Sequence, residues 1–172
     1  MGVIANDIPF DQDRCDLYDP AGKDVVVEWF NQFGFTGIEE NLAEAKKKFS
    51  KIWDVKGLSL SGKEFRIEVE IKKDWGTKWK DVPFRYSTMD IPYRKRDKAK
   101  EHATHHIVVG ADLRRLFVVE RSVVLDSPVT YKKVRNRGWQ EEPFFNVPLP
   151  SPKSAFYFKN ETGKWEPYKG TY

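Results

Sequence analysis

The stretch Glu64-Phe-Arg-Ile-Glu-Val-Glu-Ile-Lys72 predicts the central strand of the fold. Apolar and charged side chains alternate along it, and a period of two is the pattern of a strand that buries one face and keeps the other polar. The apolar face consists of Phe65, Ile67, Val69 and Ile71, and the polar face of Arg66, Glu68, Glu70 and Lys72.

A second short apolar run precedes this strand and is interrupted by one acid. Lys51-Ile-Trp-Asp-Val-Lys56 contains Asp54, and residues 58–63 between the two runs predict a turn with its tip at Ser61-Gly62. A hairpin folded about that tip places Asp54 opposite Glu70 or one residue out of register, where cross-strand neighbours lie roughly 5 Å apart. The sequence therefore predicts two neighbouring carboxylates at one end of a hairpin.

The predicted pair of carboxylates, Asp54 and Glu70, would be stabilised by a cation. Two carboxylates this close repel each other, and the repulsion raises their pKa values unless a positive charge lies between them. Mg²⁺ is suited to that position, because it binds one or two carboxylates together with waters and phosphate oxygens. Lys72, on the face of Glu70, is placed to orient a metal-bound water. These residue types predict metal-assisted hydrolysis of a phosphodiester.

The order Asp54, a gap, then Glu70-Ile-Lys72 on a hairpin that follows an amphipathic helix resembles the PD-(D/E)XK nuclease superfamily, which has the restriction-endonuclease-like fold. Trp53 stands where the motif is named for proline, a position that varies widely in that superfamily. The resemblance implies an α/β (α+β) fold whose αβββαβ core has a mixed central sheet flanked by helices. It covers about residues 21–124, and we expect residues 125–172 to be a β- and loop-rich extension packed on that core.

The resemblance also implies an activity and the residues that perform it. It implies a deoxyribonuclease that requires Mg²⁺ or Mn²⁺ and cuts by in-line attack, which leaves a 5′-phosphate. Asp54, Glu70 and the backbone carbonyl of Ile71 would hold the metal. Lys72 would position the attacking water and steady the transition state.

Three further acids are candidates for a supporting part. Asp24 and Glu28 lie one turn apart in the predicted first helix, where the resembled fold sometimes has an acid that helps to hold the metal. Glu68 shares the face of Glu70, but no lysine follows it two residues later. This makes Glu70 and Lys72 the preferred pair and leaves Glu68 to support them or to take no part.

The other elements are predicted from periodicity and capping. An apolar stripe predicts a helix over about 21–33, which Gly34 ends in the manner of a C-terminal cap. Pro92 marks the end or the edge of a third strand over 87–93. The remaining expected segments are an irregular arm at 1–19, a helical or irregular segment at 38–49, a basic helix at 94–103, and strands at 105–109 and 116–124.

Two basic segments are candidate nucleic-acid contacts. The run from Arg94 to Lys100 holds five basic residues in seven, and contacts to backbone phosphates need basic side chains but no particular base sequence. The second candidate is the loop 72–80. It carries Trp75 and Trp79, which either stack on bases or pin a surface loop. The candidate phosphate-binding residues are Arg94, Lys95, Arg96, Lys98, Lys100, Lys73 and Lys78.

Composition predicts a single domain spanning residues 1–172. The formal charge of +4 permits a polyanionic partner such as DNA or RNA. The single cysteine, Cys15, excludes an internal disulfide and predicts a reducing compartment. The sequence shows no apolar run of membrane-spanning length, so we expect a cytoplasmic protein, such as one from a phage or mobile element. The aromatic-rich tail leaves a homodimer open.

Other chemistries fit the sequence less well. His102, His105 and His106 match no zinc-binding spacing, so we expect structural roles for them. The sequence contains no glycine-rich phosphate loop, which argues against ATP hydrolysis. The alternative to a nuclease is a non-catalytic nucleic-acid-binding or adaptor protein with the same fold. The intact set of Asp54, Glu70 and Lys72 favours the nuclease.

Overall fold

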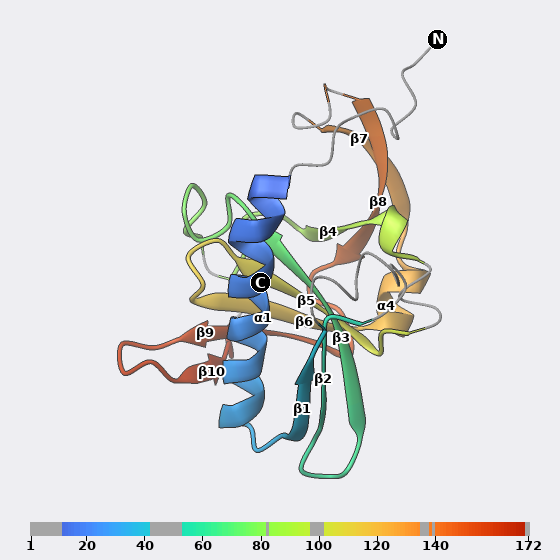
Figure 1. Ribbon diagram of the computed structural model, residues 1–172. Helices are drawn as coiled ribbons and strands as arrows, with labels where there is room; N and C mark the ends of the chain where they lie inside the picture. The colour runs from blue at the N-terminus through green and yellow to red at the C-terminus, as the bar shows by residue number, and fades with distance from the viewer. Residues whose placement is uncertain are drawn as a thin grey trace.

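The computed structural model describes residues 12–41, 53–81, 83–96, 102–134, 138 and 140–170, and for residues 12–19 and 94 it describes the backbone only. These residues form an α+β fold built mostly of strands (Figure 1). The elements are α1 (Gln12–Gln32), β1 (Thr36–Glu40), β2 (Val55–Leu58), β3 (Glu64–Lys72), β4 (Thr88–Pro92), the 3₁₀ helix η2 (Tyr93–Lys95), β5 (His105–Gly110), β6 (Arg115–Glu120), α4 (Arg121–Asp126), β7 (Val129–Val134), β8 (Gln140–Pro148), β9 (Ser154–Lys159) and β10 (Trp165–Pro167).

A mixed, seven-stranded central sheet has the order β1-β2-β3-β5-β6-β9-β10. β3 and β5 are parallel, and the other neighbouring pairs are antiparallel. A parallel pair needs a crossover connection, and the chain between β3 and β5 includes β4 and η2. The strand predicted over 64–72 is thus confirmed as β3, and it lies near the middle of the sheet.

α1 covers one face of the central sheet. Its apolar stripe is buried there, with Val26 and Phe30 fully inaccessible to solvent. Gly22 allows close approach to the sheet, because a β-carbon at this position would lie 3.1 Å from Val69 Cγ1. The helix is followed by Gly34 with a φ of +76°, the left-handed conformation expected after a helix end. The apolar side chains of β3 therefore face α1.

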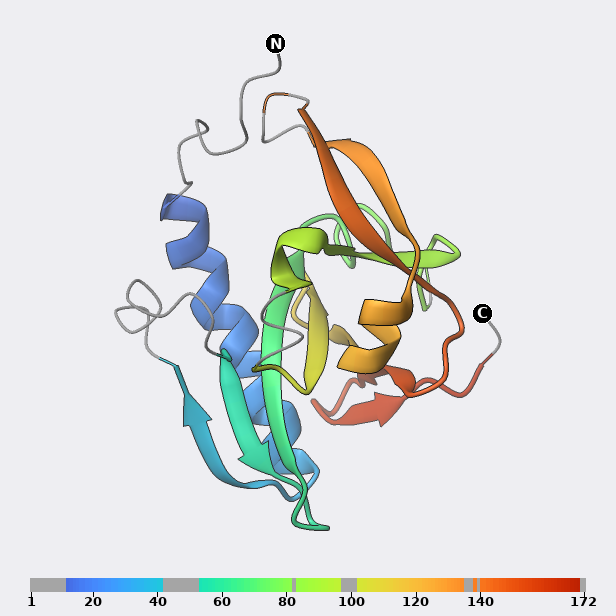
Figure 2. The same cartoon turned by 90° about the vertical axis from the view of Figure 1, so that its right-hand side faces the viewer.

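The opposite face of the central sheet is covered by a three-stranded sheet of order β4-β8-β7, together with η2 and α4 (Figure 2). A second apolar core fills part of this layer and includes Trp75, Met89, Phe117 and Phe156. The polar side chains of β3 point toward this layer rather than into open solvent. This explains how charged residues on an amphipathic strand become buried.

Several predicted elements differ from the structure. The first helix begins at Gln12 instead of about 21 and contains Pro20, so 12–19 is not an irregular arm. The segment predicted as helical or irregular at 38–49 begins inside β1, and its residues 42–49 lie outside the described residues. β1 has a single apolar side chain, Ile38, which is why its sequence shows no strand pattern.

The predictions for the later strands are partly correct. The strand over 105–109 is confirmed by β5, whereas 116–124 ends as a strand at Glu120 and continues as α4. The third strand at 87–93 exists as β4 but belongs to the small sheet. Residues 125–172, which we expected to pack on the core as an extension, also supply two strands of the central sheet, β9 and β10.

Candidate functional site

The β2–β3 hairpin places Asp54 differently from the sequence-based prediction. Val55 pairs with Ile67, because the connecting loop is centred on Ser61 and is closed by the Ser59 N–H donating to the Lys63 carbonyl at 2.9 Å. Asp54, directly before β2, accepts the Val69 N–H on Oδ2 at 2.8 Å. Its carboxylate therefore lies at the level of Glu68 and Val69. The predicted register, with Asp54 opposite Glu70 or one residue out, is off by one to two residues.

Asp54 and Glu68 are charged residues inside the protein. Asp54 is 1% exposed and Glu68 2% exposed. Burial of a carboxylate is unfavourable unless hydrogen bonds or a positive charge stabilise it. The backbone N–H of Val69 donates a hydrogen bond to Asp54, and an ammonium group forms an ion pair with Glu68, as described next. Glu68, assigned at most a supporting part from sequence, is thus central to the site.

The ammonium of Lys95, at the end of η2, lies between the acids of β3. Its Nζ is 2.9 Å from Glu68 Oε1 and 3.6 Å from Glu70 Oε2, and it donates to the Val69 carbonyl at 3.2 Å. Burial alone lowers the pKa of Lys95, but the carboxylates of Glu68, Glu70 and Asp54 outweigh burial and raise it. We call Asp54, Glu68, Glu70 and the Val69 carbonyl the acidic cluster. It already binds one cation, supplied by the protein.

Glu70 is the most exposed carboxylate of the acidic cluster, with 29% of its side chain accessible. Its Oε2 is buried and accepts no hydrogen bond within the described part of the chain. The ion pair with Lys95, at 3.6 Å, is longer than that of Glu68. The carbonyl in the cluster is that of Val69, whereas the sequence-based prediction was Ile71, whose side chain lies on the α1 face.

Lys72 lies farther along the same face in a different environment. Its Nζ is 5.8 Å from the centre of the Phe84 ring. Burial lowers the pKa of Lys72, with Lys132 acting in the same direction, while Asp90 and Glu70 oppose the shift. The two lysines beside the acidic cluster therefore differ. Lys95 is held protonated, and Lys72 gives up its proton more readily than an exposed lysine.

The small sheet contributes polar groups that sequence reasoning missed. Asp90 of β4 accepts from Lys132 Nζ and from Asn146 Nδ2, each at 2.6 Å. His106 of β5 is in register with Glu68 and is 3% exposed, so it also belongs to the buried polar layer. Only the pairing of strands distant in sequence brings these residues near β3.

The two acids predicted on the first helix are not brought to the acidic cluster. α1 covers the opposite face of the central sheet (Figure 2). Asp24 is exposed there, and Glu28 pairs with Lys159 Nζ at 2.6 Å. Neither position favours a part in the same site.

The described side chains of the basic run make contacts within the protein. Lys95, predicted to bind phosphate, instead binds the acidic cluster, and Arg96 Nη1 donates to Tyr93 Oη at 2.6 Å. Lys98 and Lys100 lie outside the described residues, as does the side chain of Arg94. This segment therefore supplies at least one cation to the protein interior.

The loop after β3 is pinned by its tryptophans. Trp75 is fully buried, and its Nε1 donates to the Pro83 carbonyl at 3.2 Å, so it has no face free for a base. Trp79 packs edge-on against Tyr86 at 5.1 Å. Lys73 and Lys78 remain exposed on this loop. Among the described side chains, they are the predicted phosphate-binding residues that are exposed.

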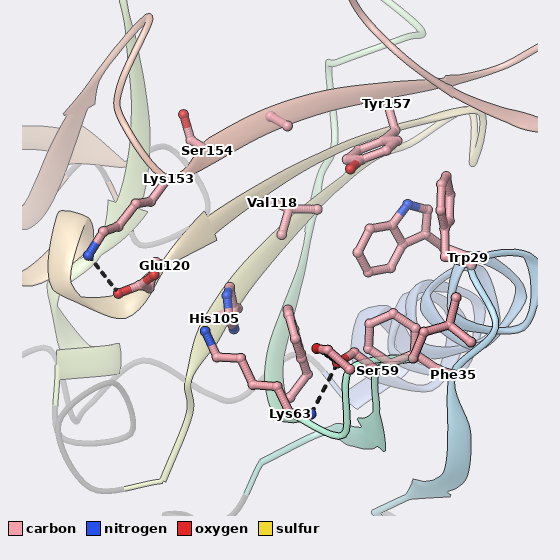
Figure 3. A pocket seen from close by; sticks show the side chains of 15 residues that line it. Trp29, Phe35, Ser59, Lys63, His105, Val118, Glu120, Lys153, Ser154 and Tyr157 are labelled. Atoms are coloured by element: carbon pink, nitrogen blue, oxygen red, sulfur yellow. Dashed lines mark hydrogen bonds and ion pairs between the residues drawn. The ribbon is translucent and has the colours of Figure 1, made fainter.

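A cavity of about 700 Å³ opens on the α1 face of the central sheet (Figure 3). Its charged groups are partly committed to each other, because Lys153 Nζ lies 3.3 Å from Glu120 Oε1. This cavity is on the other side of the sheet from the acidic cluster. The aromatic side chains that line the cavity are Trp29, Phe33, Phe35, Phe65 and Tyr157.

His105, on the wall of this cavity, is expected to make stability fall as the pH decreases. Burial, reinforced by Lys63, lowers its pKa from 6.5 to about 4, against the opposing effect of Glu120. The unfolded chain therefore takes up a proton between these pH values while the folded chain does not. Protonation then favours unfolding, by about 3 kcal/mol once the pH has fallen to about 4. Denaturant unfolding at about pH 7 and about pH 4.5 measures the loss.

The matched variant for this prediction is His105→Phe. The His105 ring is stacked on Phe65 with centroids 4.2 Å apart, so phenylalanine keeps the stack and removes the titrating group. We expect a smaller loss of stability over the same pH interval. An equal loss in the wild type and the variant would show that His105 is not the group responsible.

Comparisons with known proteins leave the site to be interpreted from its own geometry. Searches with family models, against curated proteins and against solved structures each gave no match. Within the described residues, no group of three or more His, Cys, Asp or Glu side chains is arranged so that it could hold a metal ion. No helix among those residues is long and apolar enough to cross a membrane.

Proposed function

We propose that the chain is a Mg²⁺- or Mn²⁺-dependent nuclease of the PD-(D/E)XK type that hydrolyses phosphodiester bonds of DNA. One observation carries this proposal: the acidic cluster binds a cation, the Lys95 ammonium, through carboxylate and carbonyl oxygens. Such hard oxygen ligands are those that Mg²⁺ prefers. The buried Oε2 of Glu70, which accepts no hydrogen bond within the described residues, offers a further oxygen to a metal.

The order of elements supports a restriction-endonuclease-like core. α1 is followed by three consecutive neighbouring strands, β1 to β3, and β5 then lies parallel to β3. This matches the order of an αβββαβ core in part, because β4 of the small sheet and η2 lie between β3 and β5, where that core has its second helix. The segment predicted to be that helix, 94–103, is described only up to Arg96 and from His102.

Each residue of the site then has a distinct part. Asp54, Glu68 and the Val69 carbonyl would hold the metal, and Glu70 would share it. When bound, the metal supplies Lewis acidity to a phosphate oxygen and lowers the pKa of a water. Lys72, whose pKa burial lowers, is suited to accept a proton from the attacking water.

Cleavage assays with metal present and removed test this function. We expect the protein to cut plasmid or single-stranded DNA with Mg²⁺ or Mn²⁺ and to stop when EDTA is added. Asp54→Asn should abolish cutting, whereas Asp24→Asn, on the exposed side of α1, should cut like the wild type. Cutting that persists in EDTA, or in Asp54→Asn, would overturn the proposal.

The second candidate is a non-catalytic nucleic-acid-binding or adaptor protein with this fold. The Lys95 ammonium favours it, because an internal cation 2.9 Å from Glu68 stabilises the acidic cluster without any metal. In that case the protein would cut neither DNA nor RNA under any metal condition, and would bind nucleic acid in a salt-sensitive manner. The same assays therefore distinguish the two candidates.

A further inference from the structure

The cavity on the α1 face of the central sheet has the size and the walls of a small-molecule site. Its volume of about 700 Å³ falls within the range of roughly 300–1,000 Å³ that is usual for ligand pockets. Pairs of its aromatic rings meet edge to face, Trp29 with Tyr157 at 5.2 Å between centroids and Phe35 with Phe65 at 5.1 Å. Such walls favour another flat ring, because ring edges and ring faces attract each other electrostatically.

His105 gives the cavity a buried polar wall with a fixed orientation. The residue is 7% exposed, its ring is stacked on Phe65, and its Nδ1 shares a hydrogen bond of 2.8 Å with Thr104 Oγ1. Burial lowers the pKa of His105 to about 4, so the imidazole is neutral at about pH 7. When Nδ1 accepts from the Thr104 hydroxyl, Nε2 carries the proton and can donate to an anion. The wall therefore offers one hydrogen bond and no charge of its own.

The charged side chains that line the cavity leave one positive charge unbalanced. Lys153 Nζ lies 3.3 Å from Glu120 Oε1, whereas Lys63 forms no ion pair with any described residue. The Lys63 side chain extends toward His105 (Figure 3), and its charge adds to burial in lowering the pKa of that histidine. The Lys63 ammonium therefore acts on the interior of the cavity, and a single negative charge on a ligand would balance it.

Both lysines of the cavity start from a constrained backbone. The Lys63 N–H donates to Ser59 Oγ at 3.1 Å, and the Lys63 carbonyl accepts the Ser59 N–H at 2.9 Å. Lys153 has a φ of +55°, which is uncommon for a residue with a β-carbon. Its carbonyl accepts the Glu120 N–H at 3.1 Å, which ties this conformation to the end of β6. A rim held in this way has less to order when a ligand binds.

We propose that this cavity binds a planar aromatic carboxylate, with the ring among the aromatic walls and the carboxylate beside Lys63 and His105. The site goes beyond the nuclease function and does not depend on it, because the cavity and the acidic cluster lie on opposite faces of the central sheet. A flat ring suits the walls better than a flexible chain, which loses more rotamer freedom on binding. One carboxylate matches the single unbalanced charge of Lys63.

Calorimetric titration with 2-naphthoate tests the site. We expect the wild type to bind it with a dissociation constant below about 1 mM, and to bind 2-naphthamide, which has the same shape without the charge, about tenfold more weakly. Octanoate, which has the carboxylate but no ring, should also bind about tenfold more weakly than 2-naphthoate. Lys63→Gln should weaken 2-naphthoate binding about tenfold and leave 2-naphthamide binding unchanged.

Two further variants separate charge from shape. Lys164→Gln is the matched control, because Lys164 is an exposed lysine between β9 and β10 that does not line the cavity. It should bind every ligand like the wild type. Ala155→Leu keeps the charges but fills part of the cavity, so it should weaken 2-naphthoate and 2-naphthamide binding alike.

Three results would overturn the proposal. The first is an absence of 2-naphthoate binding to the wild type at about 1 mM ligand. The second is an equal affinity of the wild type for 2-naphthoate and 2-naphthamide, or an unchanged 2-naphthoate affinity in Lys63→Gln, since the cavity would then not select an anion. The third is octanoate binding as tight as that of 2-naphthoate, which would assign the cavity to an aliphatic chain.

Discussion

Glu68→Gln is expected to lower metal-dependent DNA cleavage about a thousandfold, a loss of about 4 kcal/mol in transition-state stabilisation. The substitution keeps the shape of the side chain and removes the negative charge that a divalent metal requires. Glu68 is 2% exposed and makes the shortest ion pair of the acidic cluster, 2.9 Å to Lys95. Initial cleavage rates at saturating Mg²⁺ measure the effect, and calorimetric titration with Mn²⁺ gives the accompanying loss of metal binding.

Glu70→Gln provides the comparison that decides between two versions of the site. Glu70 contacts the shared cation at 3.6 Å and its side chain is 29% exposed, so we expect a loss of about tenfold. The hairpin register predicted from sequence assigns the main part to Glu70 instead. A larger loss of cleavage rate in Glu70→Gln than in Glu68→Gln would support the assignment of the main part to Glu70, provided that both variants retain the wild-type circular dichroism spectrum.

Local patterns were sufficient for the central strand, but they gave Glu68 at most a supporting part beside Asp54 and Glu70. The alternation over 64–72 gives β3 with its bounds, and Asp54 is near it as expected. The hairpin register was not predictable in the same way, because it depends on the length of the loop. A loop centred on Ser61 in place of 61–62 moves the partner of Asp54 from Glu70 toward Glu68.

Non-local packing accounts for what the sequence could not give. The pattern of 88–92 indicates a strand, but only its pairing with β8 shows that it belongs to the small sheet. Lys95 lies in a strongly basic run, which normally indicates a solvated or phosphate-binding surface. Its ammonium turns inward because three acids of the acidic cluster lie within reach on the covered face of the central sheet. No pattern within the run itself contains that information.

Lys95→Met is expected to destabilise the metal-free protein by about 3–5 kcal/mol, because removing one partner of a buried ion pair leaves a buried charge without its counter-ion. Methionine retains most of the volume, so the loss reports charge and not a cavity. For a chain of this size the midpoint of thermal unfolding should fall by roughly 10 °C. Denaturant unfolding in the presence of EDTA gives the free energy of unfolding directly.

Two further measurements show whether this loss comes from the acidic cluster. The double variant Glu68→Gln/Lys95→Met removes both partners of the 2.9 Å pair and should recover much of the stability lost in Lys95→Met. Mn²⁺ at about one hundred times its dissociation constant should restore about 2.7 kcal/mol to Lys95→Met, since the metal replaces the missing ammonium. If neither the double substitution nor Mn²⁺ restores stability, Lys95 stabilises η2 by packing, and the acidic cluster does not need a cation. Recovery by both would show that the same carboxylates accept either an internal ammonium or a divalent metal.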